Sequence, residues 1–318
     1  MRNIVILDGY VTNPGELSWK EIESLGSVEI YDRTASEDIV SRAKNAEIIV
    51  TNKCVFTKEV MASLPSLKCI CLLATGYNNV DIKAATAQGI TVSNAVGYST
   101  TSVAQHVFAL ILAITNKVAE HNVSVHDSKW SDSEDWSYRL GPLEELHGKV
   151  LGIYGFGTIG QKVADIGLAF GMNIIATKRK MEGFSYNNVK LISEDELLQQ
   201  SDYLSLNAAL SKENTHFISR DSLSKMKAEA IIINTARGPL INEADLADAL
   251  RNETIRGAAL DVLSDEPPNK GNPLFNIKNC IITPHISWAS LQSRKRLINI
   301  VAKNIESYIN GNPINTVT

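Results

Sequence analysis

Strand-like and helix-like segments alternate along almost the whole chain, and this alternation restricts the fold more than any other feature. The first series of β-branched runs contains NIVILD, SVEIYD, AEIIVT, LKCICLLA and ITVSNA, separated by helical stretches such as EDIVSRAKN and TKEVMASL. A second series contains VLGIYG, NIIAT, YLSLNAA, AIIINTA, GAALDVL and CIITPH. Such alternation is typical of βαβ units on a parallel sheet. Two series in 318 residues predict two doubly wound α/β domains.

Two longer helices are also predicted. Residues 100–118 read TTSVAQHVFALILAITNKV and are apolar nearly all round, so we expect a helix buried on several sides at a domain or subunit interface. Residues 291–310 read LQSRKRLINIVAKNIESYIN, which is typical of an amphipathic helix. The longest apolar run, VFALILAI, is much shorter than the ~20 residues of a membrane span, so no membrane partner is expected.

A glycine pattern marks the start of the second series. Gly155, Gly157 and Gly160 come directly after a predicted strand and open a predicted helix. Gly155 would permit a tight turn, Gly157 would let the backbone approach a pyrophosphate, and Gly160 would allow close helix packing. A helix N-terminus also favours anions. The pattern in this setting predicts a dinucleotide site, although the same spacing occurs in turns by chance.

The charge balance argues against a general nucleic-acid binder. With 31 basic and 35 acidic residues the net charge is -4, so the chain has no basic surplus for phosphates. The cysteines Cys54, Cys69, Cys71 and Cys280 show neither metal-site spacing nor a paired framework. No targeting signal is recognisable. We therefore expect reduced thiols, no metal and a cytoplasmic location.

Six motifs in a fixed order carry a resemblance to a known family. They are LLATGYNNVD (72–81), SVAQHVFALIL (102–112), the glycine loop (155–160), NTARGPLIN (234–242), ALDVLSDEPP (259–268) and TPHISWAS (283–290). Nearly end to end, the chain resembles the D-isomer-specific 2-hydroxyacid dehydrogenases. Within that family, ILDGYVTNPGELSW and HISWAS are most similar to the glycerate dehydrogenases, also called hydroxypyruvate reductases.

The resemblance implies an interrupted domain arrangement that composition alone does not indicate. A substrate domain would comprise residues 1–98 and 288–318, and a dinucleotide-binding domain would be inserted between them at residues 99–287. Both would be Rossmann-like. The implied reaction transfers a hydride between NAD(P)H and a small 2-keto acid to give a D-2-hydroxy acid. The expected substrate is hydroxypyruvate, reduced to D-glycerate, with glyoxylate, reduced to glycolate, as a second.

Three residues match the family's catalytic set. Reduction of a 2-keto acid needs a proton for the carbonyl oxygen, and His285 is a suitable donor because histidine titrates near neutral pH. Glu266 matches the carboxylate partner that stabilises the charged imidazole ring. Arg237 would hold the substrate carboxylate or polarise the carbonyl through its forked guanidinium. The simpler alternatives are a histidine bonded to backbone, a solvated loop acid and a structural salt bridge.

Further contacts are implied by the resemblance alone. Backbone N–H groups near Thr75, Gly76 and Tyr77 would form a second anchor for the substrate carboxylate, and Thr75 would also approach the cofactor. Arg237 and His285 would touch both substrate and cofactor. The remaining cofactor contacts would be Thr158 and Ile159 at the pyrophosphate, Thr235 and Ala236 near the nicotinamide, and Asp261 at its carboxamide.

The strand that follows the glycine loop ends in an unusual way. NAD-binding folds usually place a carboxylate there for the ribose hydroxyl groups, but this chain has Thr177 followed by Lys178, Arg179 and Lys180. Lys178 and Arg179 would attract a 2′-phosphate, which predicts NADP as the preferred cofactor. The alternative is a solvated basic turn that leaves NAD acceptable.

Two other classes of function stay open at this point. Dinucleotide-sensing corepressors share this fold and bind partner proteins, and a catalytically silent relative would keep the fold without the reaction. The intact set of Arg237, Glu266 and His285 favours the enzyme. Trp130, Trp136 and Tyr138 follow the apolar helix, and this surface predicts a homodimer. The physiological 2-keto acid is not fixed by these motifs.

Overall fold

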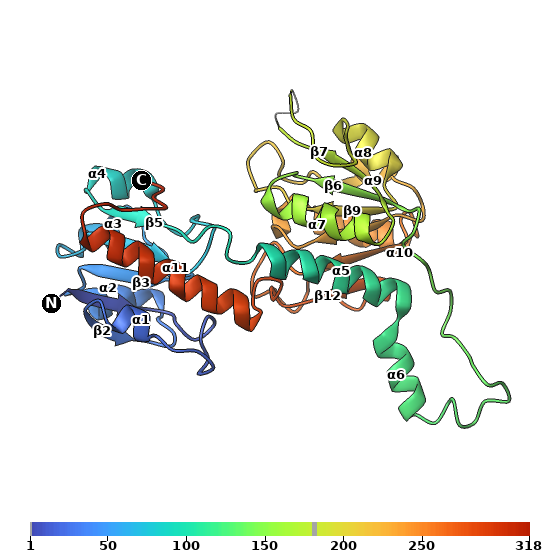
Figure 1. The fold of residues 1–318 in the computed structure, drawn as a ribbon, viewed down its shortest axis with the longest axis horizontal. Coiled ribbons are helices and arrows are strands. Elements are labelled where there is room, and N and C mark those ends of the chain that lie inside the picture. Colours follow the sequence, from blue (N-terminus) through green and yellow to red (C-terminus); the bar gives the residue numbers. More distant parts are fainter. Residues whose placement is uncertain (1, 180–182) are drawn as a thin grey trace. The chain divides into compact units, whose positions relative to one another are not determined.

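The computed structural model describes residues 2–179 and 183–318 and divides into two compact units. One combines Met1–Ser99 with Trp288–Thr318, and the other is the continuous stretch Thr100–Ser287. Each unit is built on one parallel sheet with helices on its faces (Figure 1). The predicted fold class, two doubly wound parallel-sheet domains with one inserted in the other, is confirmed.

The first unit has three layers because its strands alternate apolar side chains between two faces. Ile4 and Ile6 pack with Leu297 of α11, whereas Val5 packs with Ile39 of α2 on the other face. The strand order is β2-β1-β3-β4-β5. The strands are β1 (Asn3–Ile6), β2 (Ser27–Ile30), β3 (Ile48–Thr51), β4 (Cys69–Leu72) and β5 (Thr91–Ser93). The helices are α1 (Lys20–Glu23), η1 (Ser36–Asp38), α2 (Ile39–Ala43), α3 (Lys58–Ala62), α4 (Ile82–Ala87) and α11 (Leu291–Ile309).

A carboxylate occupies the point where the strand order of this first sheet reverses, between β1 and β3. Asp8, which follows β1, accepts hydrogen bonds from the backbone N–H groups of Asn52 (2.8 Å), Lys53 (2.6 Å) and Cys54 (3.2 Å). Successive N–H groups of this kind form a concavity that binds anions. In this protein the bound anion is the side chain of Asp8.

The second unit has the strand order β12-β11-β10-β9-β6-β7-β8. Helices α5 and α7 cover one face, and α8, α9 and α10 cover the other. The strands are β6 (Val150–Tyr154), β7 (Asn173–Thr177), β8 (Val189–Leu191), β9 (Tyr203–Leu206), β10 (Ile231–Asn234), β11 (Gly257–Leu260) and β12 (Cys280–Ile282). The helices are α5 (Thr100–Asn116), α6 (Val118–His126), α7 (Thr158–Ala169), α8 (Glu194–Gln200), α9 (Arg220–Lys225), η2 (Gly238–Leu240) and α10 (Glu243–Arg251).

The long apolar helix is shorter than predicted and is followed by a second one. Helix α5 ends at Asn116, where Lys117 takes a left-handed conformation (φ 50°) and α6 leaves at an angle of 52°. Within its unit α5 is buried along one face, and Gln105 and Ala109 are exposed. Among the described residues no single helix is long and apolar enough to span a membrane; only the bent pair of α5 and α6 meets that test by length and composition.

Candidate active site

The three predicted catalytic residues follow neighbouring strands of the second sheet. Arg237 comes after β10, Glu266 after β11 and His285 after β12, and these strands are adjacent in the order β12-β11-β10. The carboxyl ends of parallel strands meet at one edge of the sheet, where ligands of doubly wound folds bind. The sequence positions therefore converge on one edge because of the topology, although they are up to 48 residues apart (285 − 237).

The glycine loop after β6 lies at the same edge and has the geometry a dinucleotide needs. Gly155 has φ +94°, and a Cβ there would lie 2.4 Å from the backbone nitrogen of Ala208. A Cβ on Gly160 would lie 2.5 Å from the carbonyl oxygen of Gly155. Around Gly157, by contrast, a Cβ would meet nothing within 4 Å. The start of α7 at Thr158 therefore faces open space, and its first N–H groups have no intrahelical partner.

His285 and Glu266 form a hydrogen-bonded pair. The ring Nδ1 of His285 lies 2.7 Å from Oε2 of Glu266, and both side chains are about one-third exposed. The other carboxylate oxygen accepts the N–H of Leu263 at 3.3 Å. Within the described residues, Nε2 of His285 has no hydrogen-bond partner. The pair thus presents one ring nitrogen to solvent while a carboxylate holds the other, as a general acid requires.

Arg237 is exposed and makes no ion pair with any described residue, so the structural salt bridge considered for it is absent there. One guanidinium N–H donates to the carbonyl of Ala236 at 2.6 Å. The turn is held by Asn234, whose side chain donates to the carbonyl of Arg237 (2.9 Å) and accepts the N–H of Ala236 (3.0 Å). Thr235 beside it has a buried hydroxyl oxygen that finds no partner among the described residues. An unpartnered buried hydroxyl at this edge fits a polar group supplied by a bound cofactor.

The carboxylate of Asp261 is fully buried and bonded within the protein. It accepts the hydroxyl of Thr283 (2.6 Å) and the backbone N–H groups of Ile286 (2.8 Å) and Ser287 (2.8 Å). These groups flank His285 on both sides. The sequence pointed to a carboxamide contact for Asp261 and missed this use of its side chain. It also missed His106 of α5, whose Nε2 lies 3.1 Å from the hydroxyl oxygen of Thr283, although the SVAQH motif contains it.

Thr75, Gly76 and Tyr77 belong to the first unit and follow β4. The Thr75 hydroxyl donates to the carbonyl of Ala95 at 2.6 Å, and the Asn94 side chain donates to the carbonyl of Thr75 at 2.6 Å. These bonds fix the turn. Within the described residues, the backbone N–H groups of Gly76 and Tyr77 have no hydrogen-bond partner. They are therefore available to a carboxylate.

The basic turn after β7 carries two cations that form no close ion pair among the described residues, although the charge of Arg179 helps to lower the pKa of Glu213. Lys178 is half-buried, and its Nζ lies 3.8 Å from the ring centroid of Phe184. Arg179 is exposed. Lys180, which the sequence places next, lies outside the described residues. Both described cations follow the strand next to β6, on the carboxyl edge that holds the glycine loop.

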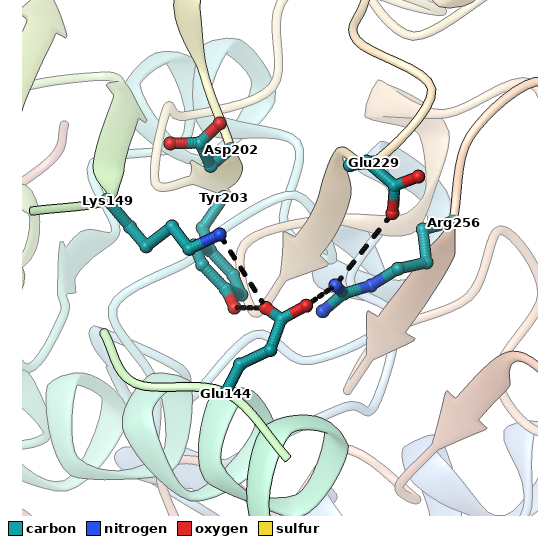
Figure 2. A pocket seen from close by; sticks show the side chains of 6 residues that line it. All are labelled: Glu144, Lys149, Asp202, Tyr203, Glu229 and Arg256. Atoms are coloured by element: carbon teal, nitrogen blue, oxygen red, sulfur yellow. Dashed lines mark hydrogen bonds and ion pairs between the residues drawn. The ribbon is translucent and has the colours of Figure 1, made fainter. Parts of the chain in front are cut away.

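A second polar cluster lies at the opposite, amino edge of this sheet and surrounds a cavity of about 180 Å³ (Figure 2). Glu144 accepts the hydroxyl of Tyr203 at 3.1 Å, pairs with Arg256, and lies 4.0 Å from Nζ of Lys149. Burial raises the pKa of Tyr203 to about 12. Burial alone would raise the pKa of Glu144, but the bond to Arg256 and its charge lower it. The cluster joins residue 144 to the sheet. Its charges are paired, Glu144 with Arg256 inside the lining and Asp202 with Lys227 outside it at 2.7 Å, as in a structural network. The lining residues are Glu144, Lys149, Asp202, Tyr203, Glu229 and Arg256.

Comparison with known proteins decides the family. Residues 108–287 match the NAD binding domain of the D-isomer specific 2-hydroxyacid dehydrogenases. A hydroxypyruvate reductase of Blautia hydrogenotrophica is 45% identical over 318 residues, which cover 99% of each chain. The chain belongs to the D-isomer-specific 2-hydroxyacid dehydrogenase family. A glycerate dehydrogenase of Methylorubrum extorquens is 38% identical over 290 residues, 90% of each chain. An acyclic imino acid reductase solved with NADPH and D-Arg is 30% identical, with a TM-score of 0.87 over 99% of this chain and 100% of that one.

Membership in the D-2-hydroxyacid dehydrogenase family confirms the predicted class of enzyme. The chain is an NAD(P)-dependent oxidoreductase that interconverts 2-keto acids and D-2-hydroxy acids. The corepressor alternative is not favoured, because the similar proteins are named as reductases and dehydrogenases.

Proposed function

We propose that this D-2-hydroxyacid dehydrogenase reduces hydroxypyruvate to D-glycerate, and glyoxylate to glycolate, with NADPH as its preferred reductant. One observation carries the proposal of reduction: the Nδ1 of His285 is 2.7 Å from Glu266 while its Nε2 has no partner among the described residues. The similarity to a hydroxypyruvate reductase and a glycerate dehydrogenase supports the choice of substrate.

In this proposal His285 donates the proton. Its Nε2 protonates the carbonyl oxygen as negative charge develops there, and Glu266 stabilises the charged ring through Nδ1. A carboxylate bonded to Nδ1 also fixes the ring orientation, so that Nε2 always points the same way. The bound reduced nicotinamide supplies the hydride that the carbonyl carbon receives.

Arg237 would hold the substrate's anionic end. The guanidinium of Arg237 has no competing carboxylate among the described residues and can form two parallel bonds to a carboxylate. A forked contact orients a carboxylate, because two bonds prevent its rotation. In the first unit, the N–H groups of Gly76 and Tyr77 can likewise bind a carboxylate.

The dinucleotide would lie along the carboxyl edge of the second sheet. Gly155, Gly157 and Gly160 with the start of α7 fit its pyrophosphate, because open space and free N–H groups meet there. The unpartnered hydroxyl of Thr235 fits a polar group of the same molecule. The other proposed contacts in this unit are Thr158, Ile159, Ala236, Arg237 and His285, as the sequence suggested. The carboxylate of Asp261 is fully buried and would act on the cofactor only through the turn that it bonds.

Lys178 and Arg179 support NADPH over NADH. Neither forms a close ion pair with a described carboxylate, although the charge of Arg179 helps to lower the pKa of Glu213, so both can approach a 2′-phosphate. Phe184 beneath Lys178 limits the freedom of its ammonium group, which lowers the entropy cost of a phosphate contact. NADH remains usable in this proposal, because its ribose, which has no 2′-phosphate, can still bind, although with lower affinity than that of NADPH.

We also propose a homodimer in the cytoplasm. Helix α6 and the segment after it project away from the sheet of their unit (Figure 1) and expose Val118 (68%), Val123 (58%) and Trp136 (88%). So many exposed apolar side chains in one segment are unusual for a monomer. Sedimentation should show a dimer at micromolar concentration, which Val123→Asp weakens and Val11→Asp, an equally exposed valine of the first unit, does not. Monomers alone would contradict the proposal.

The reaction is tested by following NADPH oxidation with hydroxypyruvate, glyoxylate, pyruvate and longer 2-keto acids, and by chiral analysis of the product. We expect the highest kcat/KM for hydroxypyruvate and a D product. His285→Asn should lower kcat by roughly 10²–10⁴-fold, the usual contribution of a general acid. His147→Asn, which changes an exposed histidine of the same unit, is the control. An active His285→Asn variant, or no turnover with any of these acids, would refute the assignment.

A further inference from the structure

A chain of hydrogen bonds leads from α5 to the turn that carries His285. It begins at Nε2 of His106, which lies 3.1 Å from Oγ1 of Thr283 and 3.5 Å from Oδ1 of Asp261. It continues from the Thr283 hydroxyl to Oδ1 of Asp261 at 2.6 Å. It ends where that carboxylate accepts the N–H groups of Ile286 and Ser287, both at 2.8 Å.

The direction of each bond follows from the chemistry of the groups. The Asp261 carboxylate can only accept, so the Thr283 hydroxyl must donate its single hydrogen to it. The Thr283 oxygen is then left as an acceptor, which requires a hydrogen on Nε2 of His106. Each group in the chain is thereby used in one way only. Such a chain defines a single arrangement of the turn.

The turn needs this support because its backbone is strained. His285 has φ 53°, a left-handed conformation that is uncommon for residues other than glycine. Its N–H group donates to the carbonyl of Asp261 at 2.8 Å, so residue 261 contacts the turn through main chain and side chain. A second residue of α5, Ser102, donates its hydroxyl to the carbonyl of Ser287 at 2.6 Å. One turn of α5 separates Ser102 from His106, so one face of this helix bonds both ends of the strained segment.

We propose that His106, acting through Thr283 and Asp261, is a positioning residue that fixes where Nε2 of the proton donor His285 points. None of the three groups needs to touch substrate for this. The inference rests on the proposed function, in which His285 is the proton donor. It gives the buried Asp261 carboxylate a use that does not depend on the cofactor, since this carboxylate accepts hydrogen bonds from Thr283, Ile286 and Ser287 of its own unit.

Removing the hydroxyl of Thr283 tests the chain of hydrogen bonds. Thr283→Val keeps the shape of the side chain but breaks both bonds, whereas Thr283→Ser keeps the hydroxyl. We expect kcat to fall about tenfold in Thr283→Val with little change in KM for the keto acid, because a misaligned proton donor weakens only the transition state. Thr283→Ser should retain most of the activity. Thr115→Val serves as the control, since it removes a buried hydroxyl of α5 whose one hydrogen bond within the described chain is to the carbonyl of Ile111.

His106, where the chain of hydrogen bonds begins, can be tested with two matched variants of its own. His106→Gln can still place an N–H group near Thr283, and His106→Leu cannot. We expect His106→Leu to follow Thr283→Val, and His106→Gln to recover at least half of the lost kcat. Equal activity of the two His106 variants would overturn the role given to this ring.

A double-mutant cycle separates positioning from a general loss of structure. If the chain acts through His285, Thr283→Val should have almost no further effect on kcat in the His285→Asn background, because the group being positioned is gone. A general structural defect would reduce both backgrounds equally. A full tenfold loss in the His285→Asn background, or no loss in the unmodified one, would overturn the proposal.

Backbone hydrogen exchange gives a readout that does not depend on catalysis. Exchange at residues 283–287, followed by mass spectrometry, should be about tenfold faster in Thr283→Val and unchanged in Thr115→Val. If exchange accelerates as expected but His285→Asn retains full activity, the chain holds the turn and the proposed role of His285 is wrong. If exchange in Thr283→Val matches the unmodified protein, the chain does not hold the turn and the inference fails.

Discussion

Reversing one charge after β7 should change which cofactor the enzyme prefers. Lys178 stands where NAD-binding folds usually carry an acid, is half-buried, and has its Nζ 3.8 Å from the ring centroid of Phe184. Lys178→Asp removes a cation from a 2′-phosphate, adds an anion beside it, and offers an acceptor to the ribose hydroxyl of NADH. All three effects act in the same direction.

The size of the change follows from the partial exposure of the site. Two unit charges 4 Å apart interact by about 4 kcal/mol at an effective dielectric of 20. Solvent screening and side-chain entropy reduce this to about 1 kcal/mol for each partly exposed pair. Loss of attraction, new repulsion and one new hydrogen bond therefore sum to about 3 kcal/mol, which shifts the ratio of kcat/KM for NADPH over NADH by roughly 10²-fold.

The assay compares kcat/KM for NADPH and NADH in the unmodified enzyme and in Lys178→Asp, at low salt and at high salt. The unmodified enzyme should prefer NADPH by about ten- to a hundredfold, with the preference shrinking as salt screens the charges. Lys44→Asp makes the same change of charge on the exposed surface of the first unit and should leave the ratio unchanged. Equal or better use of NADH by the unmodified enzyme would refute the reasoning.

Three further substitutions address the remaining parts of the site. In Glu266→Gln the ring of His285 loses the carboxylate that lies 2.7 Å from its Nδ1, so kcat for reduction should fall about tenfold, and an unchanged kcat would count against Glu266. Arg237→Ala should lower kcat/KM about 10²-fold by removing a forked, charge-assisted contact, and Arg237→Lys should restore only part of it, measured by steady-state kinetics. Gly155→Ala should lower the melting temperature because φ is +94° and the new Cβ would clash with the backbone of Ala208. Gly157→Ala, whose Cβ would contact no described atom within 4 Å, should keep the melting temperature and raise KM for NADPH.

The sequence predicted the fold and the family well because both depend on strong local signals. The buried parallel strand Ile231–Asn234 begins with three isoleucines. Another buried strand, Val150–Tyr154, is followed by glycines at a fixed spacing. Weak signals were missed for physical reasons. Strand β8 (Val189–Leu191) lies at the sheet edge and is only partly buried, so it has no apolar run to recognise. Helix α5 ends because Lys117 takes a left-handed conformation. A lysine in the sequence gives no indication of that conformation.

The support of the site was harder to predict than the site itself. His285 and Glu266 were expected as partners from their motifs, and the structure brings their atoms to 2.7 Å. His106 and Thr283 are 177 residues apart in the sequence, and only the packing of α5 against its sheet brings them together. Motifs identify residues that touch ligands, but contacts between distant segments require the tertiary fold.

The Asp8 carboxylate bears on how many nucleotides one chain can take up. Two doubly wound sheets give the chain two strand-order reversals of the kind that bind dinucleotides. At the first, the N–H groups of residues 52–54 are already saturated by an internal anion. Calorimetric titration should therefore give a stoichiometry of one cofactor per chain. Asp8→Ala should lower the melting temperature and leave that stoichiometry at one, since a vacated set of three N–H groups lacks the helix start and glycine loop that a pyrophosphate requires.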